Sequence, residues 1–170
     1  EMLSRAAKES GICEELFETH DEKPTNSFLY SLVMDTYSMG YSQNAFLDMP
    51  INHKIFLAQF DTIKKLAEEE SCVIVGRCGD YVLRSHPDLI DVFICADMED
   101  RVRRIMDRYS FSERDAVNAI KSTDRRRKNY YENYTKRKWG SIESHQMLLN
   151  ISKLGMDKTV RIIKGIYETP

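Results

Sequence analysis

Apolar side chains recur at three- and four-residue steps between Asn52 and Glu70, and charged side chains occupy the other side. This spacing is that of one face of an α-helix, so it predicts an amphipathic helix over these residues. Similar but shorter patterns predict helices over 3–9, 13–20, 27–37, 81–85, 98–109 and 158–167, and one from 112 into a basic cluster. The residues from 39 to 50 have no regular pattern and are predicted to form an exposed loop.

Three short apolar runs interrupt these helical patterns, at Cys72–Val75, Asp91–Ala96 and Met147–Ile151. Continuous apolar runs of this length are typical of strands buried on both faces. Each run is followed by a helical pattern, which predicts βαβ units and a parallel sheet covered by helices on both sides. The predicted fold class is therefore α/β, in a single domain over residues 1–170.

The composition narrows the class of protein further. The 25 basic and 27 acidic residues give a net charge of −2, which argues against an obligate nucleic-acid binder. The four cysteines include no CxxC pair, and two of them lie in the apolar runs, as expected for free thiols in a reducing cytoplasm. No run of about 18 apolar residues and no basic-then-apolar leader occurs, so we expect no contact with a membrane.

Candidate chemistry begins at the end of the first apolar run. Arg77 follows Gly76 at the carboxyl end of a predicted strand, where ligands bind in open α/β sheets. A guanidinium there suits a phosphate or carboxylate, although pairing with a neighbouring helix is an equal alternative. Asp80 could accept a hydrogen bond from a base or sugar, or cap a turn. Asn150 ends the third predicted strand and could reach a nucleotide or hold its own loop.

A basic and aromatic segment spans Lys121 to Lys138. Eight cations and two acidic residues give it a local charge of +6, and Tyr130, Tyr131 and Tyr134 are interleaved with them. One interpretation is a helical clamp that closes over a polyphosphate. A second is a nucleic-acid surface in which the tyrosines stack on bases. The third is a solvated helix face whose tyrosines pack on the core.

The remaining polar residues carry weaker signals. The four histidines show no metal-ligand spacing, so we predict no metal site among them and interpret them as ordinary core or surface residues. Asp97 follows the second apolar run and is expected to cap the next helix.

Four segments in one order resemble the cytidylate kinase-like family, a group of P-loop nucleoside monophosphate kinases. They are PTNSFLYSLVMD (24–35), CVIVGRCGDYVLR (72–84), DRRRKNYYENYTKRKWG (124–140) and LLNISKLGMDKTV (148–160). The resemblance covers nearly the whole chain. It implies a three-layer α/β/α fold of the P-loop kinase type, with a central parallel sheet and a basic helical lid over 110–140.

The resemblance also implies an activity and a set of site residues. The activity is transfer of the ATP γ-phosphate to a nucleoside monophosphate, with Mg²⁺ as the metal. Arg125, Arg126 and Arg127 fall on lid arginines that contact the phosphates during transfer. Arg77 falls on the arginine of the family's GRD turn, where Cys78 replaces Asp and Asp80 could substitute for it in binding the acceptor. Asn150 and Asp124 are assigned to ATP.

The phosphate-binding motif GxxxxGK[ST] does not occur in these 170 residues. The family places that loop, which would also hold most of the Mg²⁺ contacts, before the helix at which this chain begins. We therefore expect a truncated sequence and no phosphate transfer by these residues alone. The alternatives are a nucleotide-binding module without catalysis and, less favoured, an RNA-binding protein. The expected partners are small nucleotides, and the helical N-terminal half could pair two copies.

Overall fold

The computed structural model describes residues 2–13, 15–16 and 50–169 of the chain. Their contacts divide into a first unit, Glu1–Pro87 with Asn129–Lys136, and a second unit, Asp88–Lys128 with Arg137–Pro170. The helix predicted over 27–37 lies outside the described residues, as do most of the helix predicted over 13–20 and of the loop predicted over 39–50.

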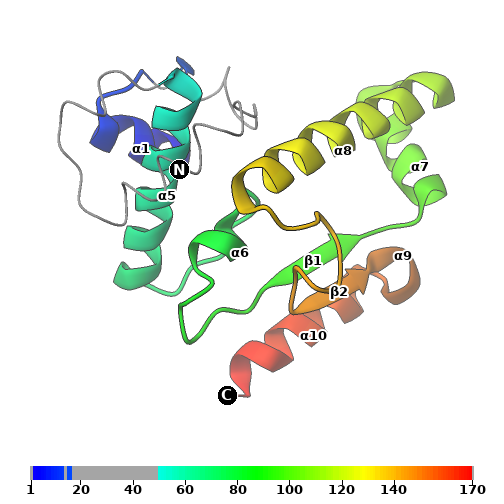
Figure 1. The fold of residues 1–170 in the computed structure, drawn as a ribbon. Coiled ribbons are helices and arrows are strands. Elements are labelled where there is room, and N and C mark those ends of the chain that lie inside the picture. The colour runs from blue at the N-terminus through cyan, green and yellow to red at the C-terminus, as the bar shows by residue number, and fades with distance from the viewer. Residues whose placement is uncertain (1, 14, 17–49, 170) are drawn as a thin grey trace. The chain divides into compact units, whose positions relative to one another are not determined.

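The first unit is helical. It contains α1 (Met2–Ser10), α5 (Ile51–Glu69), the single turn α6 (Gly79–Val82) and the end of α8 (Glu113–Thr135) (Figure 1). α1 and α5 pack through Ala6, Ala7 and Ile55. The bounds of α1 and α5 confirm the helices predicted from the apolar periodicity.

The apolar run Cys72–Val75 is not a strand, so the prediction of a buried strand there is wrong. The side chains of Val73 and Val75 are 93% and 84% exposed. A strand requires backbone hydrogen bonds to a neighbouring strand, and the described residues place none beside this run. Ile74 makes the inward contact instead, close against Gly79. The residues of this run are of the types that strands favour, but the run alone does not show whether a neighbouring strand is present to pair with it.

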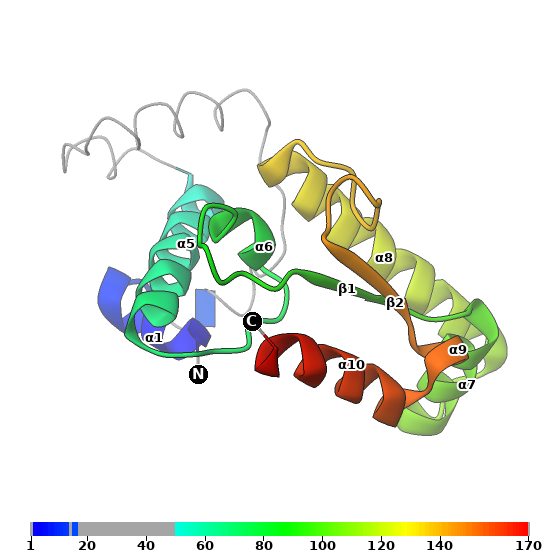
Figure 2. The ribbon, with the colours of Figure 1, turned by 90° about the horizontal axis from the view of Figure 1, so that it is seen from below.

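The second unit contains a small parallel sheet. β1 (Val92–Cys95) pairs with β2 (Met147–Asn150), with Phe93 opposite Leu148. α9 (Ile151–Leu154) and α10 (Met156–Glu168) follow β2, and α10 runs along the two strands in both views (Figures 1 and 2). Ile94 and Leu148 are 44% and 38% exposed, so the predicted burial of both faces is not met in the described residues. The fold is nevertheless α/β, as predicted, with a small sheet and mostly helices.

Two helices connect the strands. α7 (Met98–Tyr109) and α8 pack through a buried cluster of Val102, Ala116 and Ile120. The Oγ of Ser112 accepts a hydrogen bond from the Asp115 N–H at 3.2 Å, which confirms the predicted start of α8. Within the described part of the chain, no helix is both long enough and apolar enough to cross a membrane.

Phe93 is the aromatic centre of the second unit. Its ring centroid lies 5.2 Å from that of Trp139 and 5.0 Å from that of His145. Gly140, with φ +66°, leaves room for this ring, because an added Cβ would lie 2.9 Å from Phe93 Cζ. The loop between α8 and β2 is therefore fitted to one side chain of β1.

Gly140→Ala is expected to destabilise the protein by about 2–4 kcal/mol. The left-handed backbone accounts for about 1–2 kcal/mol, and crowding against Phe93 for the rest. Gly11→Ala is the matched control, since Gly11 has φ +70° and nothing within 4 Å of an added Cβ. Denaturant unfolding should show a larger loss for Gly140→Ala, and equal losses would contradict the packing argument.

The buried imidazole of His53 gives the first unit a dependence on pH. Burial lowers the pKa of His53 below its ordinary value of 6.5. Below pH 6.5 the unfolded chain therefore binds a proton that the folded chain does not. The free energy of unfolding should fall as the pH drops from 6.5 towards the lowered pKa.

His53→Phe should reduce this acid slope, because it keeps a ring of similar size and removes the titrating group. Urea unfolding at several pH values between 7.5 and 5 measures the dependence of the free energy of unfolding on pH. The same slope in the wild type and the variant would contradict the assignment to His53.

Candidate functional site

The carboxyl ends of β1 and β2 meet at one edge of the sheet, where ligands bind in α/β folds. Asn150, the last residue of β2, donates from Nδ2 to Asp97 Oδ1 at 2.9 Å. Its Oδ1 accepts from the backbone N–H of Ser152, also at 2.9 Å. Of the two roles considered for Asn150, the structure supports holding its own loop, and contact with ATP stays a prediction.

Asp97 is the centre of this group of residues. It stands at the N-cap position of α7 but makes no side-chain cap, so the predicted capping contact is wrong. Its carboxylate instead accepts from Lys153 Nζ at 2.7 Å and from Asn150. The Lys153 hydrogen bond and then the Asn150 hydrogen bond lower the pKa of Asp97, while Asp97 raises the pKa of Lys153. Competition from the Lys153 ammonium group and the Asn150 side-chain amide explains why the carboxylate does not bind the helix N–H groups.

Asp124, predicted to contact ATP, is held by Arg101. The guanidinium donates from Nη1 to Asp124 Oδ2 at 2.8 Å and from Nη2 to Oδ1 at 2.6 Å. Both carboxylate oxygens therefore have a partner within the α7–α8 pair. A role in ATP binding stays a prediction, and the structure shows a helix-to-helix bond.

The three predicted catalytic arginines follow Asp124 on α8, and all three are exposed. Arg126 Nη2 lies 3.4 Å from Thr123 Oγ1. Arg127 has a different position on the helix, because it lies seven residues after the buried Ile120 and seven before the buried Tyr134. A helix with 3.6 residues per turn places all three on one stripe. Arg127 is thus an exposed cation on a stripe that is buried on either side of it.

The tyrosines of the basic segment belong to the core of the first unit. Tyr134 stacks on Phe56 with centroids 3.9 Å apart, and Tyr130 donates to Gln59 Oε1 at 3.3 Å. Tyr131 donates to Asp80 Oδ2 at 2.7 Å. All three tyrosines are at most 5% exposed, so packing on the core is confirmed for them. Base stacking by these rings, which the nucleic-acid interpretation required, is contradicted.

The predicted acceptor residues share one turn of the first unit. Arg77 and Cys78 both have φ +55°, a left-handed conformation that ordinary residues seldom adopt. Cys78 is buried, so its thiol is not presented at the surface, whereas Arg77 is half-buried. Asp80 lies in the first turn of α6 and accepts the Tyr131 hydrogen bond, a role that neither predicted alternative included. The turn thus brings Arg77, Cys78 and Asp80 together on a tightly wound backbone.

A family model describes most of this chain. The model of the cytidylate kinase-like family matches residues 1–153. The chain belongs to the cytidylate kinase-like family. The resemblance drawn from the four sequence segments is therefore confirmed, and the family name supports a nucleotide-kinase-like theme without specifying a substrate.

A solved structure is similar to this cytidylate kinase-like chain. It is described as the crystal structure of an uncharacterized protein from Eubacterium ventriosum ATCC 27560, and it is 30% identical. The match covers 83% of this chain and 89% of that one, with a TM-score of 0.67. No protein with a curated description matches the chain significantly.

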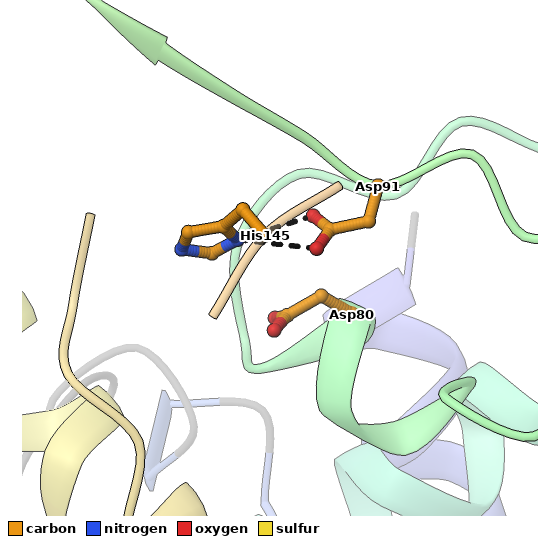
Figure 3. Close-up of side chains that lie close together, drawn as sticks. All are labelled: Asp80, Asp91 and His145. Atoms are coloured by element: carbon orange, nitrogen blue, oxygen red, sulfur yellow. Dashed lines mark hydrogen bonds and ion pairs between the residues drawn. The ribbon is translucent and has the colours of Figure 1, made fainter. Parts of the chain in front are cut away.

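One polar pair of this family member was not predicted as a pair. Nδ1 of His145 lies 3.2 Å from both carboxylate oxygens of Asp91, as the dashed lines in Figure 3 show. Nδ1 donates, because an ionised carboxylate can only accept. Both residues precede their strands, at the edge of the sheet opposite to Asp97 and Asn150. We therefore assign the pair to holding the starts of β1 and β2, and no sequence signal links residues so far apart.

Proposed function

We propose that this chain is part of a phosphotransferase that moves the γ-phosphate of ATP to a nucleoside monophosphate, with a cytidylate-like acceptor. Membership of the cytidylate kinase-like family supports the class of reaction. The observation that carries the proposal is Arg127, an exposed cation on the otherwise buried stripe of α8. An exposed guanidinium in that position suits an anionic ligand on the same side of the helix.

The proposed chemistry assigns each basic group a role. An oxygen of the acceptor phosphate attacks the γ-phosphorus, and the bond from that phosphorus to the ADP oxygen breaks. Arg127, supported by Arg125 and Arg126, would neutralise the charge on the oxygens in transfer. Arg77 would bind the acceptor phosphate, with Cys78 and Asp80 in the same turn.

The other finer features belong to the same proposal. ATP would be the phosphate donor, and the loop after Asn150 would lie near the adenine base. Asp124 would have an indirect role in ATP binding, through its position on α8. Mg²⁺ would supply positive charge that offsets the charge of the phosphates, as is general for this chemistry, and no described residue is assigned to it. We also propose the three-layer P-loop kinase arrangement, of which β1, β2 and their helices would form a part. Nucleotides would be the partners, and a cytoplasmic location and a homodimer stay proposals.

A second candidate is a nucleotide-binding module without turnover. It is favoured by one specific observation, since GxxxxGK[ST] is absent from these 170 residues. An RNA-binding function has lost its aromatic component, because Tyr130, Tyr131 and Tyr134 are buried. The intact gene product separates the two remaining candidates. Binding of ATP and CMP with ADP release supports the kinase, and binding without ADP release supports the module.

Arg127→Ala in the intact gene product is expected to lower kcat by about 10²-fold or more, with a smaller effect on KM for the acceptor. The reason is that its charge is used most when the phosphoryl group is in transfer. ADP release with ATP and CMP measures both constants.

Arg114→Ala is the matched control for this substitution. It removes the same exposed side chain from the same helix, but Arg114 lies on the other side of α8 from the stripe that holds Arg127. Its kcat should stay within about twofold of the wild type. Unchanged turnover in Arg127→Ala, or equal losses in both variants, would contradict the role given to Arg127.

A further inference from the structure

The bond between Arg101 and Asp124 ties the first turns of α7 to the middle of α8. Its two hydrogen bonds, of 2.8 and 2.6 Å, join both guanidinium Nη atoms to both carboxylate oxygens. A bidentate salt bridge of this kind fixes the relative orientation of the two side chains as well as their distance. The side chains of Arg101 and Asp124 are only 32% and 26% exposed, so solvent screens the bond less than a fully exposed pair.

The Arg101–Asp124 salt bridge lies in a part of α8 that has no buried side chains. The apolar contact with α7 ends at Ile120, and no side chain from 121 to 129 is buried. Apolar packing therefore does not orient this stretch, which contains Arg125, Arg126 and Arg127. The Arg101–Asp124 bond falls within it, one residue before the first of these arginines.

The same part of α7 also holds the loop after β2. Asp97 lies one helical turn before Arg101, whose backbone N–H donates to the Asp97 carbonyl at 3.1 Å. The Asp97 carboxylate binds Asn150 and Lys153, and its backbone N–H donates to Ser152 Oγ at 2.9 Å. One end of α7 thus connects the loop at the carboxyl end of the sheet with the start of the arginine run.

We propose that Arg101 and Asp124 are positioning residues, which hold the arginine run of α8 at a fixed place relative to the loop 150–153 without touching the nucleotide. The inference rests on the proposed function, because it takes the arginine run as the phosphate site. It replaces the direct ATP contact predicted for Asp124 with an indirect one. Loss of the bond would leave the arginines present but wrongly directed.

Asp124→Asn is the decisive variant. It removes a negative charge beside three arginines, so charge alone would make an anion bind more tightly. A positioning role predicts the opposite, a loss of about 5- to 20-fold in affinity. Calorimetric titration of the folded 170-residue chain with inorganic tripolyphosphate, at low salt, measures this change. Thermal unfolding of each variant confirms that the titrated protein is folded.

Three further variants separate positioning from direct contact. Arg101→Met should weaken binding by a similar factor, and the double variant Arg101→Met with Asp124→Asn should be no worse than either single one, because both remove the same bond. The reversed pair, Arg101→Asp with Asp124→Arg, should restore most of the affinity. Arg104→Met is the control, since Arg104 is an exposed arginine on the same helix, and it should change affinity less than twofold.

The outcomes distinguish this inference from the proposed function. A wild-type chain that does not bind tripolyphosphate overturns the positioning role, while the proposed function is tested separately by ADP release from the intact gene product. Wild-type binding with tighter or unchanged binding by Asp124→Asn overturns the positioning role and leaves the phosphate site standing. Additive losses in the double variant, with no rescue by the reversed pair, would also overturn it and return Asp124 to direct contact.

Discussion

The burial of one stripe of α8 is the constraint on which the account depends. The stacking of Tyr134 on Phe56 and the hydrogen bond from Tyr130 to Gln59 fix which side of the helix faces inward. Because a helix is regular, the same stripe continues seven residues back to Arg127 and seven more to Ile120. Of the three arginines, Arg127 is therefore the one in line with the buried positions of the helix, although its own side chain is exposed. The basic and aromatic segment from Lys121 to Lys138 is therefore divided into a part whose tyrosines pack in the core and a part whose arginines are exposed.

The distribution of charge supports this division. The first unit has nine basic and 15 acidic residues, and the second has 16 basic and 12 acidic residues, so their formal charges are −6 and +4. The net charge of −2 conceals this asymmetry. An anionic ligand is favoured by the charge of the second unit, which holds the arginine run and the loop after β2. The global charge argues against a general nucleic-acid binder, but it says little about a local phosphate site.

The helices and two strands could be predicted from the sequence because each is a local pattern. The periodicity of α5 and the apolar runs of β1 and β2 depend on neighbours in the chain. The run Cys72–Val75 was predicted wrongly because strand formation depends on a partner strand, which its own residues do not encode. The pairs Arg101–Asp124 and Asp91–His145 were not predicted for the same reason. Each joins residues far apart in the chain, and the partner of a charged side chain follows from tertiary packing.

The roles of the site residues divide in the same way. Four sequence segments in order, which include Arg77, Arg125 to Arg127 and Asn150, were enough to identify the family. The structure adds what composition could not supply, namely that Asn150 and Asp124 are engaged within the protein and that the exposed Arg127 lies in line with the buried Ile120 and Tyr134. Side chains that bind neighbouring elements are candidates for shaping a site, and exposed ones are candidates for touching a ligand.

The most direct measurement is a crystal structure of the intact gene product with an analogue that joins adenosine and cytidine through a chain of phosphates. The account predicts that the guanidinium group of Arg127 lies within hydrogen-bond distance of the phosphates, while Asp124 stays bonded to Arg101. Phosphates bound elsewhere, with Arg127 directed into solvent, would contradict the central claim.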